Sequence, residues 1–314
     1  MTTLQQLERW RSTGAITAEQ HAAISAIVRK DRLSVFLELN ALLYLGVVLF
    51  AYGLGWTVYA HFTSLGDITV VLTLAALIVG CFAYCFGRAA SYAPERIESP
   101  TFAFDYVLYL GCLAFGVELG FVEFRFHVLR EQWDLYLLGS AILYFILSYR
   151  FDNRFVLSLA LSTLAGWFGW RFSMLGIHVA GSTRGDGLMY GVLVAAAGWW
   201  TRRLGLKAHF FETYLHVAAN AALAALVSGV MAGERKEAWF AALSIAAAVA
   251  IERGIRHRHF AFVAYGAVYG YVGLSAEILP HLHGQYSPFA YFIVSGAVAI
   301  ASLAIVTRRV GSEP

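Results

Sequence analysis

The chain has 314 residues, of which 59% are hydrophobic and only 14% are charged, whereas soluble proteins carry about 25% charged residues. Its net charge of +3 is small and its basic residues are scattered in pairs, which excludes a nucleic-acid-binding surface. Apolar segments long enough to cross a bilayer, about 20 residues each, recur along most of the chain. Backbone polar groups in lipid must be satisfied within their own segment, so these segments are expected to be helices. The composition therefore predicts an all-α membrane protein.

Residues 1–33 are the stretch expected to form a soluble element. A first helix is predicted to end at Gly14, and a second is predicted to start at Thr17, because Gln20 follows it at the spacing of a capping box. The helical spacing of the first helix is carried by Leu4, Leu7 and Trp10. A segment this short buries too little surface for a core of its own, so the helix pair is expected to pack on the membrane domain or on a partner. It is either a lead-in to the first span or a cytoplasmic docking or sensory element.

This segment and the first span together resemble a known family. The pattern is Leu7-x-x-Trp10-x-x-x-Gly14-x-Ile16-x-x-x-Gln20, followed by Gly46, Gly53, Gly55 and Trp56. It resembles the DUF2157 family of predicted prokaryotic membrane proteins of unknown function, although members often carry an Asn where Gly55 stands here. The resemblance implies a bacterial inner-membrane protein with a cytoplasmic N-terminal helical element. It supplies neither a reaction nor a catalytic residue.

The membrane domain is expected to comprise residues 34–310, followed by a tail at residues 311–314. Ten helices are predicted to form a polytopic bundle. In chain order they are residues 39–60, 68–86, 102–121, 133–149, 155–172, 187–200, 211–231, 238–251, 260–279 and 289–306.

The direction of these spans follows from the positions of Lys and Arg, which cytoplasmic loops retain. With the N-terminus inside, 17 of the 23 basic residues fall on the cytoplasmic side. Ten spans then place both chain ends in the cytoplasm.

Two of the spans, 187–200 and 238–251, hold only 14 residues each, a length that also suits re-entrant or buried segments. Omitting either one alone spreads the basic residues almost equally over the two sides, whereas omitting both leaves 16 inside and 7 outside. Ten spans are preferred because charged residues beside the two short spans can reach the interface and extend each helix. These residues are Arg202, Arg203, Glu237 and Glu252. Eight spans remain the alternative.

Three polar residues follow one helix face in the span 211–231. Glu212, His216 and Asn220 are spaced i, i+4 and i+8, from the inner boundary to mid-bilayer. Ionisable groups inside a bilayer are costly and often functional. One hypothesis is a polar path in which His216 carries a proton between Glu212 and a site beyond Asn220. The alternative is interhelical hydrogen bonding that holds the bundle together.

A second candidate site comes from comparing the spans 102–121 and 260–279. The spacing of Tyr106, Gly111 and Glu118 in the first of these spans equals the spacing of the same three residue types in the second, at Tyr265, Gly270 and Glu277. This equal spacing is either a trace of duplication or chance. Glu118 lies between Gly116 and Gly120, a close-packing spacing that predicts a carboxylate at a helix interface. Glu118 and Glu277 would form an outer entry site for an ion or solute, or else two carboxylates exposed to water.

The sequence predicts neither a metal site nor a cofactor. All three cysteines fall inside apolar segments, where a thiol behaves as a small hydrophobe. Glu277, His281 and His283 are possible zinc ligands, but a fourth ligand is not evident and the spacing matches no strong motif. No phosphate-binding loop, nucleophile elbow or metalloprotease helix occurs, so we assign no catalytic residue.

These observations leave three hypotheses for function. The first is transport or permeation of a small solute or ion, based on the number of spans and the polar stripe. The second is a non-catalytic scaffold or sensor whose N-terminal helix pair engages a cytoplasmic protein. The third is a membrane-embedded enzyme, which requires convergent carboxylates in a cleft.

Overall fold

A computed structural model describes residues 9–17, 20–21, 45–50, 52–53, 56–57, 66–128, 132–176, 178, 183–232, 235–282 and 291–298. Every regular element in these residues is a helix, which confirms the all-α prediction. The long helices are α4 (Asp67–Arg88), α5 (Phe102–Phe126), α6 (Trp133–Phe151), α7 (Arg154–Leu175), α8 (Thr183–Arg203), α9 (Phe211–Ala232), α10 (Lys236–Arg256) and α11 (Phe260–Ile278). Two short 3₁₀ helices, η2 (Ala208–Phe210) and η3 (Leu279–Leu282), precede α9 and follow α11.

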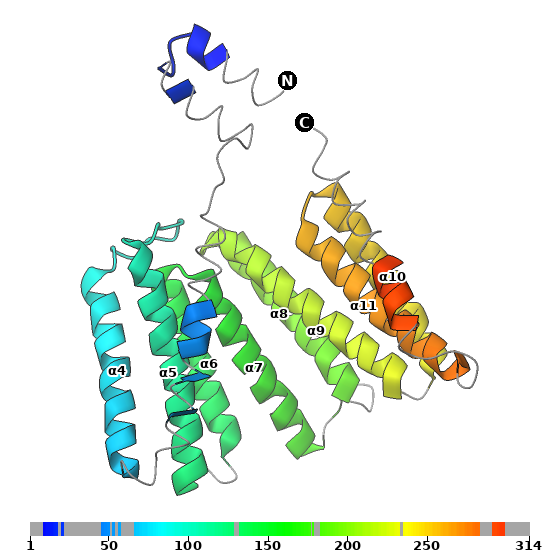
Figure 1. Ribbon diagram of the computed structural model, residues 1–314, viewed down its shortest axis with the longest axis horizontal. Coiled ribbons are helices and arrows are strands. Elements are labelled where there is room, and N and C mark those ends of the chain that lie inside the picture. Colours follow the sequence, from blue (N-terminus) through cyan, green and yellow to red (C-terminus); the bar gives the residue numbers. More distant parts are fainter. Residues whose placement is uncertain are drawn as a thin grey trace.

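The long helices alternate in direction and pack as successive hairpins in one row (Figure 1), in which α9 contacts α8, α10 and α11. The most extensive contacts join consecutive helices into four hairpins: α4–α5, α6–α7, α8–α9 and α10–α11. The C-termini of α4, α6, α8 and α10 therefore meet at one end of the row, which we call the basic end. The other end is called the opposite end.

Five helices in the described residues are long and apolar enough to cross a membrane. They are Asp67–Arg88, Ala103–Phe126, Arg154–Leu175, Ala208–Met231 and Lys236–Arg256. The chain is therefore a membrane protein with several apolar helices. The predicted spans 39–60 and 289–306 are described in part, as helix at 45–50, 52–53, 56–57 and 291–298, so the count of ten stays a prediction.

Both of the short predicted spans lie inside longer helices. α8 and α10 each have 21 residues, which is about 31 Å at 1.5 Å per residue and matches a hydrocarbon core of about 30 Å. The added turns contain the flanking charged residues that the sequence analysis expected to extend each helix. A full crossing by each helix remains a prediction.

The start of the N-terminal segment has the predicted local geometry. Gly14 has a left-handed φ of 70° directly after a helical turn. The backbone N–H of Gln20 donates to the Thr17 hydroxyl at 3.2 Å, and the backbone N–H of Thr17 donates to the Gln20 side chain at 2.9 Å. These reciprocal bonds form a capping box. Most of the second predicted helix, residues 22–33, lies outside the described residues.

Close packing within the hairpins depends on small residues at particular positions. A side chain at Gly191 of α8 would place its Cβ 2.9 Å from the carbonyl oxygen of Ala218 in α9. In the last hairpin, a Cβ at Gly266 of α11 would lie 2.6 Å from the carbonyl oxygen of Ala247 in α10. In a membrane, helices are not driven together by the hydrophobic effect, so such close van der Waals contacts contribute much of their association.

The cysteines fill the core, as the sequence predicted. Cys85 and Cys112 are fully buried among aromatic residues of α5, α6 and α7, and Cys81 is buried beside them on α4. The thiols are free.

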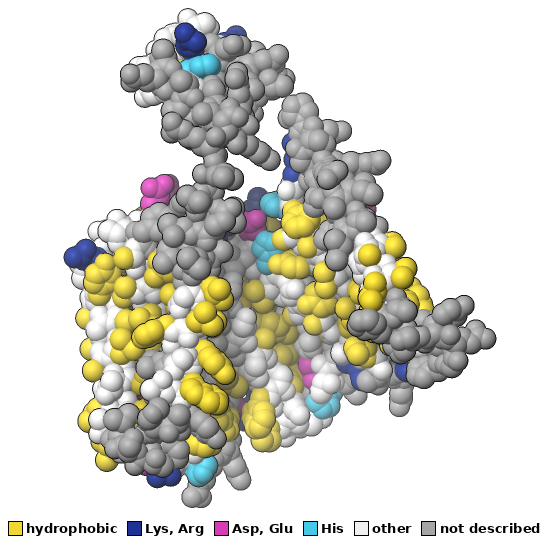
Figure 2. Space-filling model, in the orientation of Figure 1, with side chains coloured by type: hydrophobic (Ala, Val, Ile, Leu, Met, Phe, Trp, Pro, Cys, Tyr) yellow, Lys and Arg dark blue, Asp and Glu magenta, His cyan; other side chains and the backbone are white. Residues whose placement is uncertain are grey.

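Large apolar side chains cover much of the outer surface of the row (Figure 2). Ile68, Val192 and Ile245 are each at least 67% exposed, and they come from three different hairpins. An apolar surface this extensive, on helices of membrane-spanning length, is the surface that lipid tails cover.

Candidate functional site

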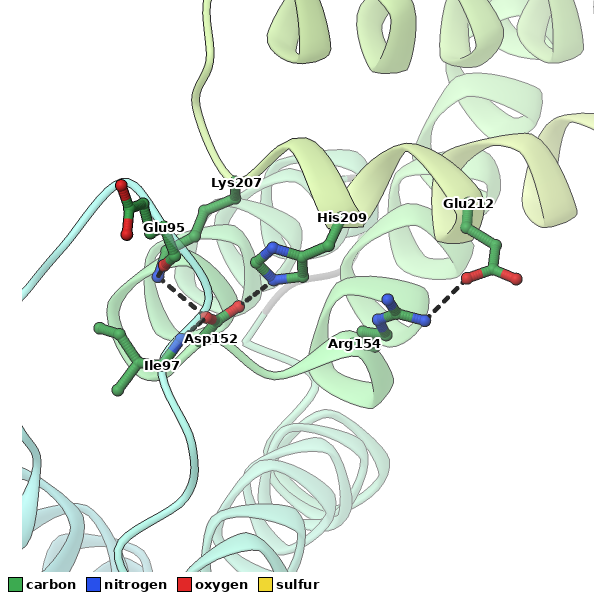
Figure 3. Close-up of polar contacts among 7 residues, drawn as sticks. All are labelled: Glu95, Ile97, Asp152, Arg154, Lys207, His209 and Glu212. Atoms are coloured by element: carbon green, nitrogen blue, oxygen red, sulfur yellow. Dashed lines mark hydrogen bonds and ion pairs between the residues drawn. The ribbon is translucent and has the colours of Figure 1, made fainter. Parts of the chain in front are cut away.

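The basic end contains a fully buried ionic cluster (Figure 3). The side chains of Asp152 and Lys207 are 1% and 0% exposed, and Lys207 Nζ lies 3.1 Å from Asp152 Oδ2. Lys207 Nζ also donates to the carbonyl oxygen of Glu95 at 3.0 Å. The backbone N–H of Ile97 donates to Asp152 Oδ2 at 2.5 Å, and the His209 ring bonds to the other carboxylate oxygen.

Local backbone geometry positions this cluster. Asp152 ends α6 and Lys207 precedes η2, and both have a left-handed φ, of 56° and 47°. Aspartate visits this region more readily than most residues, whereas lysine does so at a cost that the surrounding contacts must offset. The two residues join the 89–100 loop, the α6–α7 turn and the α8–α9 connection at one point.

Hydrogen bonds keep Asp152 ionised. Burial by itself raises the pKa of this carboxyl, but the bonds from Ile97, Lys207 and His209 outweigh burial and hold the pKa below its ordinary value of 3.8. The cluster is therefore a charged pair with its hydrogen bonds satisfied, which is the arrangement that makes a buried ion pair tolerable.

A pocket of about 760 Å³ opens next to this cluster, between the basic ends of α7, α8, α9, α10 and α11. Its charged lining consists of Arg154, Arg202, Arg253, His209, His257, His259 and Glu212. Figure 2 shows histidine and acidic side chains at the rim between α9 and α11, with hydrophobic surface below them. With the histidines neutral, three arginines against one glutamate give the pocket an excess of positive charge.

Glu212 is the centre of the charged rim. Its carboxylate lies 2.8 Å from Arg154 Nη1, 3.5 Å from His259 Nδ1 and 3.9 Å from His216 Nε2. Arg202 lies over the ring of Phe211, 5.0 Å from its centroid. Among the described residues, neither Arg202 nor Arg253 forms an ion pair, whereas Arg154 pairs with Glu212.

Below the rim the pocket is apolar. The deeper lining consists of Leu215, Ala219, Ala222, Leu223, Ala246, Val249 and Ala250. Val249 is 45% exposed, so this wall is open toward the surface of the row. An arginine rim over an apolar interior suits a ligand with a negative group and an apolar body.

The three members of the predicted polar stripe remain neighbours on α9 but have different contacts. Glu212 lines the pocket, whereas His216 stacks on Phe262 of α11 with ring centroids 4.8 Å apart. Asn220 accepts a hydrogen bond from Tyr269 of α11 at 3.2 Å. Four residues of an α-helix make one full turn plus about 40°. Side chains spaced i, i+4 and i+8 therefore point in successively different directions around the helix. His216 and Asn220 therefore contact α11, and the pocket follows Glu212, Leu215 and Ala219 instead.

The predicted outer carboxylates do not come together. Glu118 lies on α5 in the first hairpin and Glu277 on α11 in the last one, and these two hairpins lie at opposite sides of the row (Figure 1). Gly116 faces Tyr144 of α6, with 3.7 Å between a Cβ at this position and the tyrosine oxygen. Gly120 has open space around it, so the glycine spacing forms an interface on one side only.

The possible zinc ligands lie at the margin of the described chain. Glu277 lies in the last turn of α11, the side chain of His281 is not described, and His283 lies outside the described residues. Within the part of the chain that the structure describes, no three His, Cys, Asp or Glu residues form a group suited to a metal ion.

Sequence reasoning missed the arginines of the pocket and the buried pair of Asp152 and Lys207. From the sequence these basic residues indicate the cytoplasmic side, and Arg202 also extends a short span, but nothing in their spacing predicts a shared pocket. A usable signal was present, because α4, α6, α8 and α10 each carry an acidic residue in the first turn and a basic residue in the last turn. These charges complement the helix dipoles, and the repeat indicates that the helix ends bearing arginine gather at one place.

A comparison with family profiles tests the resemblance that the N-terminal segment and the first predicted span show. The profile described as a predicted membrane protein, DUF2157, matches residues 8–157. Residues 8–157, a little under half of the chain, match the DUF2157 family. The predicted resemblance is confirmed, and the DUF2157 match extends beyond the first span through α4, α5 and α6 to the start of α7. Of the pocket residues it includes Arg154. Searches of curated proteins and of solved structures give no match.

Proposed function

We propose that this protein transports a small anionic solute with an apolar body across the bacterial inner membrane, and that the pocket is its binding site. The observation that carries the proposal is the rim of Arg154, Arg202 and Arg253 over an apolar interior. A hydrophilic cation would meet like charge at this rim and would have no polar partners in the depth.

The layout that we propose for the membrane places the basic end in the cytoplasm. Ten described Lys and Arg residues lie at this end: Arg88, Arg96, Arg150, Arg154, Arg202, Arg203, Lys207, Arg253, Arg256 and Arg258. Five described basic residues lie at the opposite end: Arg125, Arg171, Arg184, Arg235 and Lys236. This asymmetry is the one that orients membrane proteins. With ten spans, both chain ends are cytoplasmic.

Uptake by reconstituted vesicles tests the proposal. The purified full-length chain is placed in liposomes that enclose alkaline phosphatase, and 4-nitrophenyl phosphate, an impermeant aryl anion, is added outside. Entry is measured as the yellow product formed inside. We expect entry faster than in protein-free liposomes, and a loss of at least five-fold in the Arg202→Gln/Arg253→Gln variant. A wild-type rate equal to that of empty vesicles would refute transport.

The same assay separates the pocket from the polar stripe. If His216 and Asn220 hold α9 against α11, the His216→Ala and Asn220→Ala variants keep the wild-type uptake rate and lose thermal stability. If they form a proton path that transport requires, both variants lose uptake while remaining folded.

A scaffold or sensor role for the N-terminal segment is the second candidate. It is favoured by Trp10, whose side chain is 50% exposed beside the capping box of Thr17 and Gln20, because an exposed aromatic residue on a helix is a common anchor for a partner. Crosslinking from a photoreactive residue at Trp10 in living cells tests it, and recovery of the uncrosslinked chain alone would argue against a partner. A membrane-embedded enzyme has less support, since Glu212 is the one carboxylate among the described residues that line the pocket.

A further inference from the structure

The dimensions of the pocket match one leaflet of a bilayer. On α9, the lining extends from Glu212 at the rim to Leu223 in the depth, eleven residues or about 16 Å at 1.5 Å per residue. The hydrocarbon core is about 30 Å thick, so one leaflet contributes about 15 Å, which is close to the length of this lining. With its rim at the level of the headgroups, as in the proposed orientation, the pocket would reach the level where acyl chains end.

The chemistry of the lining changes along this depth as it does along a lipid. The rim holds Arg202 and Arg253, and neither forms an ion pair with a described residue. The depth holds alanine, leucine and valine from two helices, with the exposed Val249 on the open side. Guanidinium groups bind phosphate oxygens in a bidentate manner, and basic pockets between helices at the cytoplasmic side suit anionic headgroups.

We infer that the ligand of this pocket is a phosphate-bearing anionic membrane lipid, which enters from the cytoplasmic leaflet through the open side near Val249. Its phosphate lies between Arg202 and Arg253, and an acyl chain lies along the alanines of α9 and α10. This inference rests on the proposed function for the location of the site and for the orientation of the row. It replaces a water-soluble substrate with a lipid.

Glu212 has a defined place in this arrangement. Its carboxylate is paired with Arg154 at 2.8 Å inside the same rim. It partly neutralises the positive charge of Arg154, so a phosphate that enters is expected to bind Arg202 and Arg253, which form no ion pair with a described residue.

Lipid retention by the purified full-length chain tests the inference. The protein in detergent is mixed with equal amounts of phosphatidylglycerol and phosphatidylcholine bearing the same acyl chains, and the bound lipid is measured by native mass spectrometry. We expect at least a five-fold preference for phosphatidylglycerol. Equal retention of the two lipids would overturn the inference.

Matched variants locate the bound lipid. Arg253→Gln is expected to lose most of the preference, whereas Arg256→Gln is expected to keep it, because Arg256 pairs with Glu252 one turn away and does not line the pocket. Ala222→Phe fills the depth and is expected to abolish retention, whereas Ala224→Phe places the same ring on an exposed position of the same helix. An equal loss in both members of either pair would overturn the assignment. Thermal melts establish that each variant is folded.

Two further results separate this inference from the proposed function. If inorganic phosphate raises the melting temperature of the wild-type protein as much as phosphatidylglycerol does, the site binds free anions, and the lipid assignment fails while transport stands. If phosphatidylglycerol is retained but the aryl phosphate does not enter vesicles, transport fails while the lipid site stands.

Discussion

The carboxylate of Asp152 holds together the parts of the chain that meet at the basic end. It is 1% exposed and contacts Lys207, His209 and the backbone N–H of Ile97. Removing one partner of a buried ion pair leaves the other charge unpaired, which costs about 3–5 kcal/mol. We expect Asp152→Asn to lower the free energy of unfolding at pH 7 by about 3 kcal/mol. The Asp152→Asn/Lys207→Met variant should recover much of this loss, and thermal or chemical unfolding in detergent measures both.

The effect of this substitution depends on pH in a defined direction. The pKa of Asp152 in the folded state lies below its ordinary value of 3.8. The ionised carboxylate therefore stabilises the fold fully above pH 3.8, and this contribution is lost as the pH falls through the lower folded value. The difference in melting temperature between wild type and Asp152→Asn should be constant from pH 7 to pH 5 and should shrink below pH 4. A difference that grows on acidification would contradict the assignment.

Glu212 is the residue where sequence and structure agree about a site but differ about its role. Its spacing with His216 indicated a proton path, but the carboxylate lies among the arginines and histidines of the pocket, 2.8 Å from Arg154. Glu212→Gln removes a negative charge from the rim and is expected to strengthen binding of 4-nitrophenyl phosphate. A gain of about 1 kcal/mol for a partly exposed charge corresponds to about a five-fold lower Kd. Isothermal titration measures it, and weaker binding in the variant would show that Glu212 positions the arginines instead.

At the scale of the helix, small residues determine how closely the hairpins pack. Gly191 of α8 approaches the backbone of α9 so closely that a Cβ would lie 2.9 Å from the carbonyl oxygen of Ala218. Gly191→Leu is therefore expected to destabilise the fold by about 2 kcal/mol, within the range for overpacking. Gly169→Leu is the control, because Gly169 of α7 is exposed and has open space around it. Fluorescence-detected melting compares them, and equal stability of the two variants would show that the α8–α9 contact tolerates separation.

The helices themselves were largely predictable, whereas their contacts were not. Hydropathy alone located the segments that became α4 to α11, because bilayer thickness constrains the length of an apolar run. The predicted spans are shorter than α8 and α10. An apolar segment stops at the first charged residues near the interface, whereas the helix continues through them. The sequence predicts one polar path for Glu212, His216 and Asn220 because they share a helix face. Spacing alone does not show which of these side chains faces the pocket and which contacts α11. The buried pair of Asp152 and Lys207 combines residues 55 positions apart, a contact that no local pattern encodes.

At the scale of the whole molecule, the uneven distribution of charge predicts the orientation in the membrane. Glu98 lies in the exposed loop between α4 and α5 at the basic end, and Val128 lies just beyond α5 at the opposite end, where it is 62% exposed. Single cysteines at these two positions, in a chain whose three buried cysteines are replaced by alanine, report each side. In spheroplasts we expect an impermeant maleimide to label Val128→Cys at once and Glu98→Cys only after lysis.

The number of spans gives this layout a second, independent test. Ten spans, or eight, return the chain to the side where it began, so reporters fused to the N- and C-termini should both be active in the cytoplasm. Reporters on opposite faces would require an odd number of crossings, with one of the predicted spans failing to cross. The arginines of the pocket would still share one end of the row, since α4 to α11 alternate in direction (Figure 1). If the maleimide labels Glu98→Cys first, that end faces the periplasm, and a lipid would enter the pocket from the outer leaflet.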